Sequence, residues 1–178
     1  MKEIGLVHVY TGDGKGKTTA AFGLALRAYE NGLRVYIVQF LKTSPSGEAA
    51  FVERLGDGRF RVFRFEKPHG FTYDQDAEAA KALRGDVERA LDFIHTVFQE
   101  RSCDLLVLDE IICACQLGLV TREELCGLID NKPPACELVL TGRGAPEWLV
   151  ERADYVTNMT LVKHPFQTGT DARKGIEF

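Results

Sequence analysis

The stretch TGDGKGKTT, residues 11–19, connects a predicted strand to a predicted helix. The apolar run IGLVHVYT (4–11) before it has the pattern of a strand, and KTTAAFGLALRAYEN (17–31) after it is rich in alanine and leucine, as helices are. A glycine-rich loop in this position offers backbone N–H groups and a helix N-terminus to an anion. The sequence therefore predicts a phosphate-binding loop.

The spacing within this loop is unusual. The common phosphate-binding loop follows G-x-x-x-x-G-K-[ST], whereas here the first glycine, Gly12, gives a loop one residue shorter before Gly16. Lys17 is placed to contact phosphate oxygens as a point charge, and Lys15 adds a second cation inside the loop. Thr18 has the position whose hydroxyl usually ligates Mg²⁺. A glycine-rich turn that binds nothing is the alternative, and the combination of strand, helix, lysine and threonine argues against it.

Strand-like and helix-like segments alternate along the rest of the chain. The further predicted strands are 34–40, 60–65, 104–110, 136–142 and 155–162, and the further predicted helices are 46–55, 74–101, 121–130 and 145–153. This alternation, with apolar strands, predicts a three-layer α/β fold with a mainly parallel sheet, and the loop at 11–19 makes it a fold of the P-loop NTPase type. We expect one domain over 1–178, in which 163–178 forms a C-terminal tail or cover.

An acidic pair follows one of the predicted strands. DLLVLDE (104–110) is apolar on both faces and ends with Asp109 and Glu110. Ligands of such sheets bind at the carboxyl ends of the strands. We expect this strand beside the loop strand, with one acid holding Mg²⁺ and the other orienting Thr18 or a water molecule. Solvated acids at an ordinary strand end are the alternative.

Two further loops carry side chains of interest. TGRG (141–144) ends another predicted strand, and Arg143 between its glycines either neutralises charge on a triphosphate or lies in solvent. HGFTY (69–73) places Phe71 and Tyr73 in a loop, where they either pack or stack on a large flat ligand. From the residues alone, the chain is a Mg·NTP-binding α/β protein.

Composition limits the function classes. Hydrophobic residues make up 45% of the chain and charged residues 27%, as in ordinary globular proteins. The net charge of −4, without a basic stripe, argues against nucleic acid as the main partner. No apolar run is long enough for a membrane span, and MKEIGLVHVY lacks the pattern of a signal peptide.

The cysteines favour a reducing compartment. They are odd in number and have apolar neighbours: Cys103, Cys113, Cys115, Cys126 and Cys136. We expect reduced thiols and a cytoplasmic location. CAC (113–115) has no second pair at ligand spacing, so we expect no metal–thiolate site.

Several motifs together resemble one family. They are TGDGKGKTTAAFG, IVQF, GFTY, LVLDE, TGRG and the ending VKHPFQTGTDARKGIEF, in this order over nearly the whole chain. This set resembles the P-loop type of ATP:corrinoid adenosyltransferase, of which the short lysine-bearing loop and the ending are distinctive. The resemblance implies a RecA-like core, a homodimer, and transfer of the 5′-deoxyadenosyl group of ATP to the cobalt of cob(I)alamin or a related corrinoid. Triphosphate leaves, and the product serves adenosylcobalamin biosynthesis or salvage.

The resemblance also implies roles for individual residues. The expected ATP-binding residues are Thr11, Gly12, Asp13, Gly14, Lys15, Gly16, Lys17, Thr18, Thr19 and Arg143. Of these, Lys15, Lys17 and Arg143 would be catalytic, by neutralising the triphosphate. Thr18 and Glu110 would bind Mg²⁺.

The resemblance gives Asp109 a supporting role at this metal. Phe71 and Tyr73 would lie on the corrinoid side and help to strip the lower axial ligand from cob(II)alamin, and an electron-donating reductase such as a flavoprotein would act with the enzyme. Two positions depart from many family members, since Asp13 replaces Asn and Tyr73 replaces the Trp of some.

Other functions remain open at this point. A P-loop ATPase or kinase would form ADP and phosphate or a phosphorylated product, and a regulatory corrinoid- or ATP-binding module would bind without turnover. A RecA-like nucleic-acid binder is disfavoured by the acidic balance. Because only about three residues precede the first predicted strand, we expect the tail or a partner subunit to cover the corrinoid pocket.

Overall fold

A six-stranded parallel sheet forms the middle layer of the computed structural model, which describes residues 4–42, 46–66 and 77–177. The strand order is β3-β2-β4-β5-β1-β6, and each neighbouring pair is parallel. The strands are β1 Val7–Thr11, β2 Val35–Gln39, β3 Phe60–Arg64, β4 Leu105–Asp109, β5 Glu137–Thr141 and β6 Tyr155–Asn158. All the carboxyl ends therefore lie along one edge.

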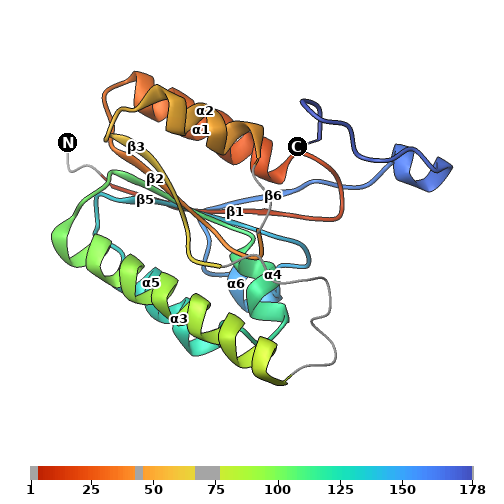
Figure 1. Ribbon diagram of the computed structural model, residues 1–178. Helices are drawn as coiled ribbons and strands as arrows, with labels where there is room; N and C mark the ends of the chain where they lie inside the picture. Colours follow the sequence, from red (N-terminus) through yellow and green to blue (C-terminus); the bar gives the residue numbers. More distant parts are fainter. Residues whose placement is uncertain (1–3, 43–45, 67–76, 178) are drawn as a thin grey trace.

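Helices cover both faces of the sheet (Figure 1). The helices α1 Lys17–Glu30 and α2 Gly47–Leu55 lie on one side. On the other side lie α3 Ala77–Glu100, α4 Ile111–Gln116, α5 Arg122–Asn131 and α6 Glu147–Val150, and the short 3-10 helix η1 Pro165–Thr168 follows in the C-terminal segment. The predicted three-layer α/β architecture is confirmed.

The central strand β4 shows why the layers form. All five of its residues are buried, and alternate side chains enter different cores. Leu105 and Val107 pack with the residues of α1, whereas Leu106 and Leu108 pack with those of α3, α4 and α5. A strand whose side chains are apolar on both faces is stable only between two layers of helices.

The strand order differs from the expectation in one respect. We expected β4 beside β1, but β5 lies between them. Apolar strands joined by helical connections fit several positions in a parallel sheet, so their composition does not specify their neighbours. The acidic end of β4 nevertheless lies at the same edge as the glycine-rich loop, because β1, β5 and β4 are parallel.

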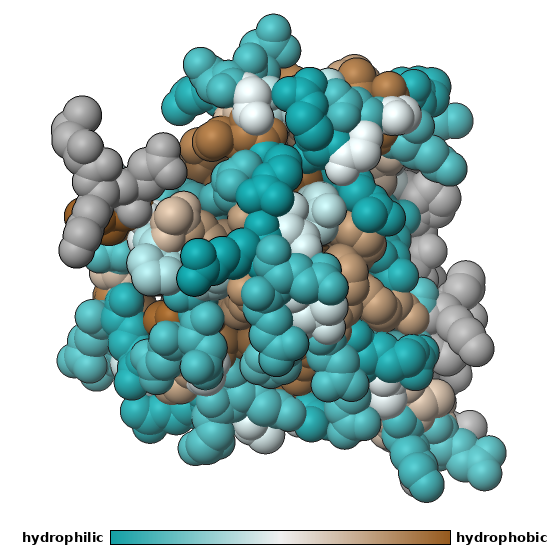
Figure 2. Space-filling model, turned by 90° about the vertical axis from the view of Figure 1, so that its left-hand side faces the viewer, coloured by the Kyte–Doolittle hydropathy of each residue, from teal (hydrophilic) through white to brown (hydrophobic). Residues whose placement is uncertain are grey.

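The end of the chain departs further from the predicted pattern. The last strand ends at Asn158 rather than at residue 162, and all its residues are exposed, Tyr155 by 53%. It is an edge strand that pairs with β1 alone. At the end of the molecule where β1 begins, Figure 2 shows mostly hydrophilic side chains, with the apolar ones in small separate groups.

Candidate active site at the carboxyl edge of the sheet

The glycine-rich loop follows β1 directly, and its glycines allow close contact with the chain after β6. Gly12 has φ +100°, and a Cβ atom there would lie 2.3 Å from Asn158 Oδ1. A Cβ atom at Gly14 would lie 2.6 Å from the carbonyl oxygen of Met159, to which the Gly14 N–H donates at 2.7 Å. Gly16, at φ +115°, is the N-cap of α1. Close backbone packing therefore requires glycine at positions 12 and 14, and the positive φ favours glycine at positions 12 and 16.

The side chain of Lys17 is buried inside this loop. Its ammonium group donates to the carbonyl oxygens of Gly12 at 2.5 Å and Gly14 at 2.9 Å. Burial lowers the pKa of Lys17, while the charge of Glu110 acts to raise this pKa and that of Arg143 acts to lower it. Screening weakens such charge effects beyond about 10 Å, so these three predicted site residues lie in the same part of the molecule.

The other loop residues have different environments. Asp13, Lys15 and Thr19 are exposed, and the Lys15 ammonium donates to the carbonyl oxygen of Ile176 at 3.3 Å. Thr11 is buried, and its hydroxyl accepts a hydrogen bond from the N–H of Ala145, in the loop after β5, at 3.0 Å. The loop thus contacts both the C-terminal tail and the neighbouring strand end.

Asp109 is the most buried acid of the site, and its side chain is only 1% exposed. Its Oδ1 accepts from the hydroxyls of Thr141 at 2.7 Å and Thr18 at 3.0 Å. Its Oδ2 accepts from Gln39 Nε2 at 3.0 Å and from the Lys42 ammonium at 2.5 Å. A buried carboxylate is stable only when it is paired and hydrogen-bonded, and here four donors satisfy it.

Three of these surrounding residues were not predicted from the sequence: Gln39, Lys42 and Arg64. Gln39 ends β2 in register with Asp109, and Arg64 at the end of β3 donates from Nε to Gln39 Oε1 at 2.8 Å. Burial lowers the pKa of Arg64, and the charge of Asp109 opposes that change. For Gln39 and Arg64 the available signal was a polar residue at the end of a strand, as for Asp109 at the end of β4, whereas Lys42 lies beyond the end of β2.

Glu110 turns the chain sharply after β4. Its backbone has φ +66°, a left-handed conformation that costs a non-glycine residue about 1 kcal/mol. Its N–H donates to the Thr141 hydroxyl at 2.9 Å. Burial, followed by a hydrogen bond with Glu110, raises the pKa of the Cys113 thiol, and the Cys113 sulfur accepts from the N–H of Arg143 at 3.2 Å. Glu110 therefore lies on the Lys17 and Arg143 side of the site, while Asp109 contacts Thr18.

The oxygen atoms of Thr18 and Asp109 fit a magnesium ion. Mg²⁺ prefers hard oxygen ligands and is usually bound by one or two carboxylates together with water and substrate phosphates. The same two side chains already hold one cation, the Lys42 ammonium, which also donates to the Thr18 hydroxyl at 3.1 Å. Within the described ranges there is no cluster of three or more His, Cys, Asp or Glu residues that could form an all-protein metal centre.

Three further predictions concern the aromatic pair, the cysteines and a membrane span. Phe71 and Tyr73, the aromatic pair expected on the corrinoid side, lie outside the described residues. All five cysteines have free thiols. In the part of the chain that the structure describes, no helix combines the length and the apolar character that a membrane span requires.

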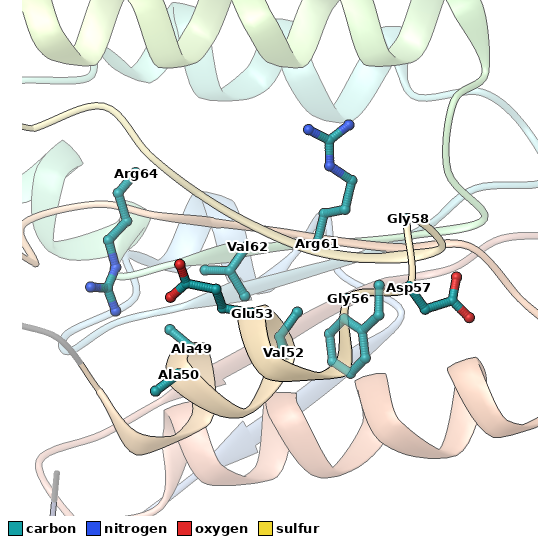
Figure 3. Close-up of a pocket in the computed structure, with 11 residues that line it drawn as sticks. Ala49, Ala50, Val52, Glu53, Gly56, Asp57, Gly58, Arg61, Val62 and Arg64 are labelled. Atoms are coloured by element: carbon teal, nitrogen blue, oxygen red, sulfur yellow. The ribbon is translucent and has the colours of Figure 1, made fainter.

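A cavity of about 500 Å³ lies beside the edge strand β3, between that strand and α2 (Figure 3). Its lining includes Val52 and Glu53 of α2 together with Arg61 and Val62 of β3. Arg64 stands at one end of the cavity and extends toward the start of α2, where its Nη2 donates to Ser46 Oγ at 3.4 Å. The same arginine contacts Gln39, so this cavity borders the polar network around Asp109.

A solved structure shares the fold. The KaiC-like protein PH0186 from Pyrococcus horikoshii OT3 superimposes with a TM-score of 0.62 over 90% of this chain and 75% of its own, at 19% identity. At this identity the likeness concerns the fold alone, and it supports the expected RecA-like P-loop NTPase architecture.

Curated relatives are similar over nearly the full length. Corrinoid adenosyltransferases from Pseudomonas aeruginosa PAO1 and Escherichia coli K12 are 37% and 36% identical to this chain, which covers 85% and 87% of their lengths. Corrinoid adenosyltransferase CobA of Salmonella typhimurium LT2 is 34% identical, with 88% of its length covered. The family model of the ATP:corrinoid adenosyltransferases BtuR/CobO/CobP matches residues 3–178. The chain therefore belongs to the ATP:corrinoid adenosyltransferase family BtuR/CobO/CobP.

Proposed function

We propose that this protein transfers the 5′-deoxyadenosyl group of ATP to the cobalt of cob(I)alamin or a related corrinoid, with release of triphosphate. Membership of the family supports this activity. The observation that carries it is the short loop, with Lys17 buried inside it and Lys15 exposed at its rim, next to Arg143 and the acids that end β4. The product serves adenosylcobalamin biosynthesis or salvage.

The proposed reaction needs stabilisation of a highly charged leaving group. In the step, the Co(I) electron pair forms a bond to the 5′ carbon of ATP, the bond from that carbon to the triphosphate oxygen breaks, and the triphosphate keeps the electron pair. Lys17, Lys15 and Arg143 would stabilise the charge that develops on it, together with the backbone of the loop from Thr11 to Thr19. The cobalt nucleophile carries no proton, so the reaction requires no general base.

We propose that Thr18, Glu110 and Asp109 hold a magnesium ion at the carboxyl end of β4. Their oxygen donors and the fully buried Asp109 carboxylate support this site. Mg²⁺ supplies additional positive charge to the triphosphate when it is bound. The residues of the chain position that charge, because Thr18 begins α1 and Asp109 is fixed by Thr141 and Gln39.

Other parts of the proposal concern the corrinoid contacts, the partners, the location and the C-terminal tail. We propose that Phe71 and Tyr73 contact the corrinoid, that an electron-donating reductase such as a flavoprotein supplies Co(I), and that the protein is a cytoplasmic homodimer. We also propose that the chain is one domain in which residues 163–178 cover the site. The contact between Lys15 and Ile176 supports the last point, since it joins the tail to the loop.

The direct test mixes the protein with Mg·ATP and chemically reduced cobalamin and follows the absorption spectrum. Adenosylcobalamin and triphosphate should form in equal amounts. An ATPase or kinase would instead give ADP with phosphate or a phosphorylated product, and a regulatory module would bind ATP or corrinoid without turnover. Either of these results, with no adenosylcobalamin, would refute the proposal.

A further inference from the structure

Lys42 occupies an unexpected position at the centre of the site. Its ammonium group lies 2.5 Å from Asp109 Oδ2 and 3.1 Å from the Thr18 hydroxyl oxygen, and Thr18 in turn donates to Asp109 Oδ1. The side chain of Lys42 is 25% exposed and that of Asp109 only 1%. A unit positive charge therefore bridges the same hydroxyl and carboxylate that we propose as magnesium ligands.

The chain turns in a strained conformation directly before Lys42. Leu41, the residue before it, has φ +56°, a conformation that a branched side chain rarely adopts. The N–H of Leu41 donates to Glu66 Oε1 at 2.5 Å, which holds this turn in place. Strained residues of this kind persist where the surrounding structure fixes them, and they cluster at functional sites. The strained residue Glu110 stands at the corresponding end of the adjacent strand β4.

The neighbouring polar groups hold Asp109 in a fixed orientation. Arg64 donates to Gln39 Oε1, so the amide nitrogen of Gln39 faces Asp109. The hydroxyl of Thr141 donates to the other carboxylate oxygen. Neither contact supplies a full positive charge to Asp109 directly, whereas Lys42 does. A buried carboxylate without such a partner is strongly unfavourable.

We propose that Lys42 and the divalent cation are alternative counter-ions of Asp109. In the metal-free protein the ammonium neutralises the buried carboxylate, and metal binding displaces it from the Thr18 and Asp109 oxygens. Because like charges repel strongly at a few ångströms, the two cations do not share the pair. Lys42 is thus a positioning residue that sets the affinity of the metal site. This inference rests on the proposed metal site. It adds that Lys42 competes with the metal ion for that site.

The experiment measures Mn²⁺ binding to the nucleotide-free protein from the electron paramagnetic resonance signal of free Mn²⁺. Removing the competing charge in Lys42→Met or Lys42→Gln should tighten Mn²⁺ binding by at least about tenfold. Lys42→Arg keeps the charge and should stay within about twofold of the wild type, as should Lys81→Met, which removes an exposed charge on α3 that salt screens. The glutamine variant keeps a hydrogen-bond donor at this position, so it still tests the inference if the methionine variant does not fold.

Unchanged Mn²⁺ affinity in the folded Lys42→Gln and Lys42→Met variants would overturn the inference. Asp109→Asn should abolish Mn²⁺ binding, and if it does not, the metal site and the inference fail together. A wild type that behaves as expected toward Mn²⁺ but forms no adenosylcorrinoid would refute the proposed function and leave this inference standing.

Chemical labelling gives a second measurement on the wild type. Acetic anhydride at trace level should modify Lys42 about threefold faster when Mg²⁺ is added without nucleotide, because the displaced ammonium becomes accessible and loses its carboxylate partner. Lys81 in the same digest provides the internal reference. A Lys42 labelling rate that does not rise with Mg²⁺ would contradict the displacement.

Discussion

At the scale of single residues, the two lysines of the loop have different environments. The Lys17 ammonium is buried and contacts two loop carbonyls, whereas Lys15 is exposed and contacts the tail. Lys17 is buried, so its charge is less hydrated than that of a surface lysine, and this burial lowers its pKa. A poorly hydrated charge in a fixed position stabilises a developing anion more strongly than a solvated one.

Lys17→Ala should reduce adenosyl transfer by at least about 100-fold, since it removes a positioned charge from the proposed triphosphate site. Circular dichroism should show that the fold is retained. The matched change Lys15→Ala should cost less, about tenfold, because an exposed charge is screened by solvent. Steady-state rates with reduced cobalamin give both numbers. Near-normal turnover in Lys17→Ala would exclude the loop from the mechanism.

The glycines provide a second comparison between single residues. Gly12→Ala places a methyl group against Asn158 at a φ of +100° and should destabilise the protein by about 1–3 kcal/mol. Gly23 lies within α1, and a methyl group there would extend into open space, so Gly23→Ala should stabilise the protein by about 0.5–1 kcal/mol. Urea unfolding measures both effects. Equal effects of the two changes would contradict the close contact with Asn158.

At the scale of elements, the start of α5 is tied to α3. Thr121 and Glu124 form a capping box, in which each side chain bonds the backbone N–H of the other residue. Arg84 of α3 donates to both carboxylate oxygens of Glu124, at 3.1 Å and 2.6 Å. The hydrogen bonds from Arg84, followed by those from Thr121, lower the pKa of Glu124 to about 2. One carboxylate thus caps a helix and joins two elements.

The ion pair between Arg84 and Glu124 stabilises the protein in a pH-dependent way. The pKa of Glu124 lies below its usual value of 4.5 in the folded protein, so its stabilisation is complete above pH 4.5 and is lost as the pH falls toward 2. Glu124→Gln should lower the free energy of unfolding by about 1 kcal/mol at pH 7, allowing for solvent screening, and by progressively less below pH 4. Glu123→Gln removes one negative charge from the same helical turn but leaves the capping box of Thr121 and Glu124 intact, so it should change stability little. Urea titrations between pH 2.5 and pH 7 test this, and a constant difference across that range would argue against the ion pair.

At the scale of the whole molecule, the sequence predicts the parts that local patterns encode. The loop, the apolar strands and the acidic end of β4 are local, and the structure brings Lys17, Thr18, Asp109 and Glu110 to one edge. The order of the strands, the contact of Lys42 with Asp109 and the exposure of β6 depend on pairings between distant segments. Such pairings have no local signal, so they required the structure.

The C-terminal tail gives the last prediction. Most of its described side chains from residue 163 onward are exposed, and the Arg173–Glu177 ion pair lies within it. Its link to the loop is the bond from Lys15 to the Ile176 carbonyl. Removal of residues 163–178 should therefore cost about 1 kcal/mol or less in stability, because little apolar surface is buried there.

The same truncation should lower kcat/KM for adenosyl transfer by about tenfold if the tail covers the site, since excluding water strengthens the charges around the triphosphate. Glu177→Gln in the full-length chain breaks only the ion pair inside the tail and serves as the milder variant. Unfolding curves and initial rates on the three proteins separate the two effects. A truncated protein with full kcat/KM would show that the tail is not a cover, whereas a cooperative loss of the fold would show that these residues belong to the core.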